Sequence, residues 1–120
     1  MIDDIVFGAL RALVPNKDGS ARVYPDIAPQ GTARPYITYQ SVGGQPTGTL
    51  EGVDSTRNCR VQINVWADKR KDVSVTMESV IVALCGDPVS AIALGEPASV
   101  YEEDTKLRGS MLDFSIWYQL

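Results

Sequence analysis

Residues 57–66 read RNCRVQINVW, a stretch in which polar and apolar side chains alternate cleanly from Asn58 to Val65. Successive side chains of a β-strand point to opposite faces, so this pattern predicts a long strand with one face in the core and one outside it. The apolar side comprises Cys59, Val61, Ile63 and Val65, and the other side comprises Arg60, Gln62, Asn64 and Trp66.

The end of the chain repeats the pattern over residues 111–120, MLDFSIWYQL. Here Leu112, Phe114, Ile116, Tyr118 and Leu120 share one face, and Asp113, Ser115, Trp117 and Gln119 share the other. The run YITYQSV at 36–42 is rich in aromatic and β-branched residues and predicts a third strand. Shorter strands are expected at 22–24 and 98–101, followed by an acidic turn over 102–106.

Two helices complete the pattern. Apolar side chains at helical spacing over residues 2–14 predict the first, which Pro15 ends. The second opens at 68–72, buries a stripe from Val73 to Leu84 and ends at Gly86. Its many β-branched residues disfavour a helix, but a strand of this length would be abnormal.

These elements predict an α+β fold in the order α-β-β-β-α-β-β, with an antiparallel sheet and two helices packed on one of its faces. The chain has 120 residues and 13.0 kDa, which is the size of one domain spanning 1–120.

Composition excludes several function classes. Eleven basic and fifteen acidic residues give a net charge of −4, so a basic surface for DNA or an anionic membrane is not expected. Histidine, the commonest general base and metal ligand, does not occur. The acidic N-terminus is unlike a signal peptide, which indicates folding in a reducing cytoplasm. Cys59 and Cys85 are expected to be buried free thiols, with a disulfide or a reactive thiol as the alternatives.

No motif in the sequence supports catalysis, so we predict no catalytic, metal-ligating or cofactor-binding residues and no cofactor. Neighbouring carboxylates such as Asp3 and Asp4 lie at helix starts or turns, where capping or solvated charges are usual. Gly43 and Gly44 are followed by no lysine and no helix, so they resemble a phosphate loop only superficially.

Two regions are candidate contact surfaces. The tryptophans on the polar side of the strands either fill sheet edges within the monomer or anchor a protein interface. The candidate interface comprises Arg60, Gln62, Trp66, Trp117 and Gln119. The second region is the stretch 43–56, GGQPTGTLEGVDST, which is longer than a tight hairpin needs and therefore a candidate docking loop. The residues of this loop expected to make the contact are Gly43, Gly44, Leu50, Glu51 and Asp54.

Several of these segments together resemble the tail-completion family of long-tailed bacteriophages and prophages. They are RVYPDIAPQG (22–31), PYITYQSVGG (35–44), RVQINVWA (60–67) and DFSIWY (113–118), preceded by the amphipathic helix. The resemblance implies a tail terminator, a structural α+β subunit that needs no cofactor. Such a protein forms a ring on the head-proximal end of the tail tube, stops tube polymerisation and offers a surface to the head connector.

The implied partners are further copies of the chain, by six-fold closure, together with the tail-tube protein and the head connector. Genomic DNA would pass without specific binding, no membrane is involved, and the protein would reside in the virion tail after assembly in the host cytoplasm. Five acids are candidates for a lumen or ring-end surface, with solvated outer surface as the alternative: Glu51, Asp54, Glu102, Glu103 and Asp104. Rival functions are a head-closure or neck protein and a small ligand-binding regulatory domain with its pocket on the concave sheet face.

Overall fold

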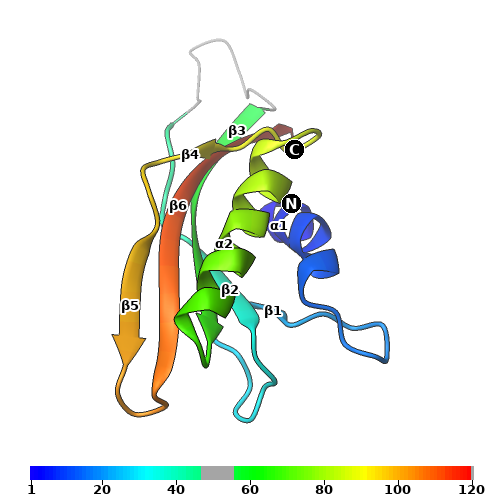
Figure 1. The fold of residues 1–120 in the computed structure, drawn as a ribbon. Helices are drawn as coiled ribbons and strands as arrows, with labels where there is room; N and C mark the ends of the chain where they lie inside the picture. The colour runs from blue at the N-terminus through cyan, green and yellow to red at the C-terminus, as the bar shows by residue number, and fades with distance from the viewer. Residues whose placement is uncertain (47–55, 120) are drawn as a thin grey trace.

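The computed structural model describes residues 1–46 and 56–119 of the chain. It has an α+β fold in which a curved sheet is crossed by the long helix α2 (Figure 1). The elements are α1 (Ile2–Leu10), a 3₁₀ turn (Arg11–Leu13), β1 (Val23–Pro25), β2 (Tyr36–Ser41), β3 (Thr56–Ala67), α2 (Arg70–Cys85), β4 (Ile92–Ala93), β5 (Ala98–Glu102) and β6 (Leu107–Gln119).

The centre of the sheet is the antiparallel ladder of β3 and β6, which runs without a break from the pair Thr56–Gln119 to the pair Ala67–Arg108. The predicted alternation holds along it, because Val61, Ile63 and Phe114 are almost completely buried. Their shared face meets α2, which buries Val73, Met77, Val80 and Leu84 in the same core. The alternating pattern of the sequence therefore identified the core face of both long strands.

The prediction of a wholly antiparallel sheet is wrong, because the sheet is mixed. Its strand order is β1-β2-β3-β6-β4, with β5 also paired to β6, and β1 runs parallel to β2. Residues 26–35 separate these two strands, which is enough chain to return to the starting end before β2 begins. Asp26 and Gly31 have φ values of 64° and 82°, which turn the backbone within this loop.

The predicted element order is also incomplete, since the two-residue strand β4 was not expected. In addition, β6 begins at Leu107 rather than Met111, directly after the predicted acidic turn, and β5 extends to Glu102, the first residue of that turn. The segment 107–110 contains a glycine and two polar residues, so its composition does not indicate a strand. It is a strand because it pairs with β3 and β5.

The helices are arranged differently from the simple prediction of two helices packed on one face. Helix α2 lies across β3 and β6, whereas α1 packs beside α2 and towards β1 (Figure 1). Helix α1 ends at Leu10, and residues 11–13 continue it as a 3₁₀ turn. Over residues 1–46 and 56–119, neither α-helix combines the length and the apolarity that crossing a bilayer requires.

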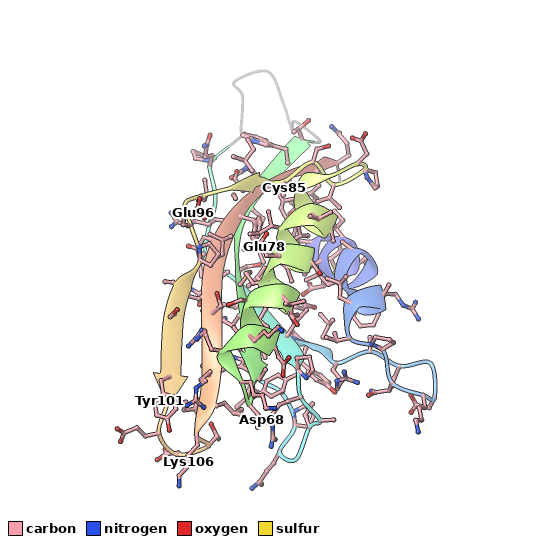
Figure 2. The ribbon with its side chains drawn as sticks, in the orientation of Figure 1. Asp68, Glu78, Cys85, Glu96, Tyr101 and Lys106 are labelled. Atoms are coloured by element: carbon pink, nitrogen blue, oxygen red, sulfur yellow. The ribbon has the colours of Figure 1, made fainter. Side chains whose placement is uncertain are left out.

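Both cysteines are free, and Cys59 is buried as predicted. Cys85 is exposed, so the expectation that it is buried is wrong. It is the last residue of α2 (Figure 2), and the stripe that this helix buries ends one residue earlier at Leu84.

Candidate functional site

The face of the sheet opposite α2 carries the polar side of the long strands. On β3 this face presents Asn58, Arg60, Gln62, Asn64 and Trp66. Beside them, β2 contributes Tyr36 and Thr38, and β6 contributes the residues from Gly109 to Trp117 that alternate with the core set. All five residues of the candidate interface lie on these two strands, β3 and β6.

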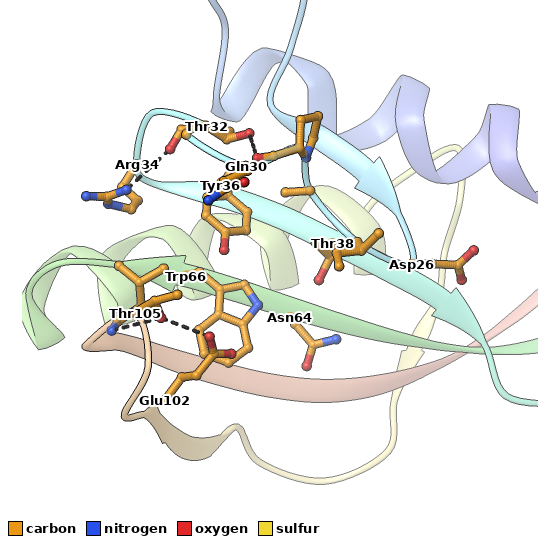
Figure 3. Close-up of a pocket in the computed structure, with 15 residues that line it drawn as sticks. Asp26, Gln30, Thr32, Arg34, Tyr36, Thr38, Asn64, Trp66, Glu102 and Thr105 are labelled. Atoms are coloured by element: carbon orange, nitrogen blue, oxygen red, sulfur yellow. Dashed lines mark hydrogen bonds between the residues drawn. The ribbon is translucent and has the colours of Figure 1, made fainter.

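One end of this face forms a cleft of about 500 Å³ (Figure 3). Its floor is a two-by-two grid on adjacent strands, since Tyr36 pairs with Trp66 and Thr38 pairs with Asn64. One wall is the loop 26–32, and the other is formed by residues of β5 and the turn before β6. The volume is within the usual range for ligand clefts.

The position of the Trp66 ring depends on Gly109, its register partner on β6. A Cβ atom at Gly109 would lie 2.7 Å from Cζ3 and 2.8 Å from Cε3 of the indole, closer than carbon atoms approach without a shift. The glycine thus leaves room for the ring to cover the β6 backbone. Trp66 is half-buried and lines the cleft.

Charged groups stand at the edge of the cleft. Arg34 Nε donates to Asp68 Oδ1 at 2.9 Å, so its charge is compensated by an ion pair. The Glu102 carboxylate accepts a hydrogen bond of 2.9 Å from the Thr105 hydroxyl. Burial raises the pKa of Tyr36, the nearby Glu102 charge raises it further, and Arg34 acts in the opposite direction. Glu102 therefore outweighs Arg34 electrostatically at the Tyr36 hydroxyl.

The other end of the same face is organised around Asn58. Its amide donates to Ser115 Oγ at 2.9 Å, and its Oδ1 accepts from the Gln45 backbone N–H at 2.9 Å. Gly44 passes over this strand with φ +155°, and a Cβ there would overlap the Asn58 carbonyl. A second cleft of about 420 Å³ lies here, lined by Val42, Gly44, Gln45, Asn58, Arg60, Leu94 and Ser115.

The candidate interface residues have distinct environments. Arg60 Nε donates to Asp113 Oδ2 at 2.8 Å, and Gln119 Nε2 donates to Thr56 Oγ1 at 2.9 Å. Gln62 is half-buried, and its Oε1 accepts a long bond of 3.4 Å from Asn64. Trp117 is 44% exposed.

The structure separates the two tryptophans that the sequence grouped together. Trp66 pairs with Gly109, and Trp117 lies eight positions further along the same strand. At the rise of an antiparallel strand this corresponds to about 26 Å. Trp66 and Trp117 therefore belong to two different regions of one face.

The residues of the candidate docking loop and the candidate acids also lie in different places. Gly43 and Gly44 lie near the start of β3, because the Arg60 N–H donates to the Gly43 carbonyl. Leu50, Glu51 and Asp54 lie outside the described residues. Glu102 ends β5, and Glu103 and Asp104 are exposed in the turn at the far end of the β3–β6 ladder.

Several residues of the cleft had no functional signal in the sequence. Arg34 and Thr38 occur in segments that predict only a loop or a strand, and Gly109, beside the Trp66 ring, lies between the predicted turn and the predicted last strand. The alternation of Tyr36 and Thr38 with the buried Ile37 and Tyr39 could have indicated that the first two share the face of Trp66. Within residues 1–46 and 56–119, no three potential metal-ligating side chains are grouped together.

Comparison with known protein families gives a match over nearly the whole chain. The model of the family described as "Tail completion protein gp17" matches residues 7–119, nearly the whole chain. No curated protein matches the sequence.

Proposed function

This chain belongs to the tail completion protein gp17 family, and we propose that it acts as a tail terminator. In this role a single domain spanning 1–120 assembles into a homohexameric ring on the head-proximal end of the tail tube. The ring ends tube polymerisation and joins the tail to the head connector. No catalysis or cofactor is part of the proposal.

The observation that supports a contact role most directly is the exposure of Trp117 at the end of β6. A tryptophan that is 44% exposed on a polar sheet face leaves a large apolar surface in water. Arg60 and Gln119 are already held by Asp113 and Thr56, so a partner would meet side chains in fixed positions. Aromatic and arginine side chains are enriched at the centre of protein interfaces.

A closed ring needs two different patches on each subunit, because each copy meets its neighbour head to tail. The second patch that we propose is the outer side of α2, where Val75 is 58% exposed and Val82 is 73% exposed. Helix α2 covers the opposite face of the sheet from Trp117. A subunit could therefore contact one neighbour through its sheet and the other through its helix.

The charge of the chain fits the passage of DNA through such a ring. A net charge of −4 disfavours tight contact with phosphates, so DNA would slide without specific binding. Glu102, Glu103 and Asp104, exposed at one end of the sheet, remain candidates for a lumen or ring-end surface. Glu51 and Asp54 lie outside the described residues, and the same surface is proposed for them. The segment that contains them is proposed to dock to the tube.

Native mass spectrometry of the wild type and of Trp117→Ala tests the ring. We expect a sixfold mass and annular particles for the wild type. The variant should be a monomer whose free energy of unfolding stays within about 1 kcal/mol, since an exposed side chain contributes little to folding. Tyr101→Ala is the matched control, because Tyr101 is 51% exposed at the other end of the sheet and should leave assembly intact.

Equal loss of folding and assembly in Trp117→Ala would contradict the interface. If the wild type is a monomer at every concentration, the test becomes co-assembly with tail-tube protein. A chain that also fails to co-assemble with that protein is not a tail terminator. Binding to the head connector without binding to the tube would favour a head-closure protein. Saturable binding of a small molecule, without ring formation and without co-assembly with tail-tube protein, would favour the ligand-binding domain. The cleft on the sheet face supports that alternative.

A further inference from the structure

The cleft around Trp66 contains polar groups whose hydrogen-bonding capacity the described part of the chain does not use. The hydroxyls of Tyr36 and Thr38 and the indole N–H of Trp66 have no partner among residues 1–46 and 56–119. Asn64 uses its amide only for the long bond to Gln62, and its carbonyl oxygen is unpaired there. These groups lie on the floor of the cleft, where a bound molecule that carries N–H donors could pair with the hydroxyl and carbonyl oxygens among them.

The floor is apolar at one end and rich in acceptors at the other. Tyr36 and Trp66 are register partners on β2 and β3, and both aromatic side chains line the cleft. Next to it lie the oxygens of Thr38 and Asn64, and Glu102 faces the same cavity from β5 (Figure 3). A planar group that carries several N–H donors would match this arrangement, because it can cover the rings while donating to the oxygens around them.

The charge of the cleft restricts its occupant further. Asp26 and Glu102 line the cleft, whereas Arg34, the basic residue in its lining, is paired with Asp68. Arg108 is on the alternate side of β6, where its guanidinium stacks over the Tyr101 ring at 5.5 Å. The net negative charge disfavours phosphates, nucleotides and acidic ligands, and it favours a cation.

We propose that this cleft binds an arginine side chain presented by a basic segment of a partner protein. The guanidinium would lie over Trp66 and donate to Glu102, while the remaining donors reach Asn64 and Thr38. The exposed acids Glu103 and Asp104 directly follow Glu102, so negative charge extends beyond the cavity. An extended charge of this kind favours a basic protein segment over a neutral sugar, which would gain nothing from the acids.

The test is a nuclear magnetic resonance titration of the ¹⁵N-labelled full chain at 0.15 M salt. The probe is a capped glycine–arginine–glycine tripeptide, and the control probe has glutamine in place of arginine. Trp117→Phe identifies the Trp66 indole signal. We expect saturable shifts of the Trp66 indole N–H and the Asn64 side-chain amide with the arginine peptide, and none with the glutamine peptide.

Two variants separate the cleft from general electrostatic attraction. Glu102→Gln should weaken binding by about fivefold, the effect of losing one exposed ion pair. Glu103→Gln makes the same change of charge one residue away, outside the cleft, and should alter binding by less than about twofold.

Three results would overturn the proposal: no shift with the arginine peptide, equal shifts with the glutamine peptide, or equal weakening in the two variants. Shifts with N-acetylglucosamine but not with the peptide would assign the cleft to a saccharide instead. The site is independent of ring formation. If the chain neither forms a ring nor co-assembles with tail-tube protein, the tail terminator is rejected, and peptide binding by that chain would leave this inference standing.

Discussion

At Gly109 the sheet lacks a side chain on its outer face, and the Trp66 ring occupies the space. The glycine is buried in a strand interior, a position where this residue normally costs stability because it packs nothing and loses much conformational freedom on folding. Here the missing Cβ allows an aromatic ring to cover the backbone of the neighbouring strand. The cleft therefore depends on a residue that contributes no side-chain atom to it.

Gly109→Ala tests this dependence. The added methyl would meet the indole at 2.7 Å, and the ring or the strand must shift, so we expect a loss of about 1–3 kcal/mol in the free energy of unfolding. Urea denaturation followed by tryptophan fluorescence measures it. Gly8→Ala in α1 is the control, because open space surrounds that position and alanine should be neutral or stabilising. Wild-type stability in Gly109→Ala would contradict the close contact.

Tyr39 makes stability depend on pH at the alkaline end. Burial, then the carboxylate of Asp3, raises the pKa of this phenol to about 12 from its ordinary value of 10. The folded state thus favours the neutral form. Its contribution is complete below pH 10 and is lost as the pH rises towards 12, because the unfolded chain ionises first.

Comparison with Tyr39→Phe isolates this contribution, since phenylalanine cannot ionise. Between pH 9 and pH 12 the unfolding free energy of the wild type should fall by about 2 kcal/mol relative to the variant. Urea titrations of both proteins at several pH values measure the difference. A difference that stays constant across this range would show that Tyr39 titrates normally.

At the scale of elements, the sequence predicted the strands better than their connections. Alternation along 57–66 and 111–119 identified the core face correctly, because burial of one sheet face imposes a period of two, and Leu120 lies outside the described residues. The same pattern carries no information on strand direction, so the parallel pairing of β1 with β2 was missed. Strand β4 has two residues, too few to show any period.

The candidate site, too, could be predicted from the sequence only in part. That Trp66 and Trp117 share a face could be predicted from their positions in alternating strands. The cleft could not, because its walls are the loop 26–32 and the turn before β6, whose positions depend on tertiary packing. The distance of about 26 Å between the two tryptophans could not be predicted either, since relative position along paired strands is not readable from either strand alone.

Helix α2 begins without a side-chain cap, so a capping residue at its N-terminus should raise the stability of the protein. Lys69 is the N-cap residue with an extended backbone, φ −124° and ψ 141°, and its side chain makes no capping bond. In Lys69→Ser a hydroxyl could accept from a free N–H of the first turn, which should stabilise the protein by about 1 kcal/mol. We expect a rise of about 4 °C in the thermal midpoint.

The matched control is Lys17→Ser, which removes the same charge from an exposed turn outside any helix. It should change the midpoint by less than about 1 °C, because surface substitutions away from caps have small effects. Equal rises in the two variants would assign the gain to net charge rather than to capping.

At the scale of the whole molecule, one sheet face carries two regions of different character. The end near Trp117 presents an exposed aromatic side chain among fixed polar groups, whereas the end near Trp66 is a cleft with acids at its rim. About 26 Å of sheet separates them, and the Arg60–Asp113 pair lies between. A protein that must join different components could use the two ends for different partners without competition.

This separation predicts that the two ends are energetically independent. Residues further apart than about 10 Å with no shared partner usually have additive effects, within about 0.5 kcal/mol. Trp117→Ala should therefore leave the affinity for the arginine tripeptide within about twofold of wild type, since 0.5 kcal/mol is roughly that factor. The combined variant Trp117→Ala with Glu102→Gln should bind as weakly as Glu102→Gln alone and should lose assembly as fully as Trp117→Ala alone. A coupling above about 1 kcal/mol in this double-mutant cycle would contradict independence, because the β3–β6 ladder would then transmit a change from one end to the other. The sheet would in that case connect the two contacts rather than support them separately.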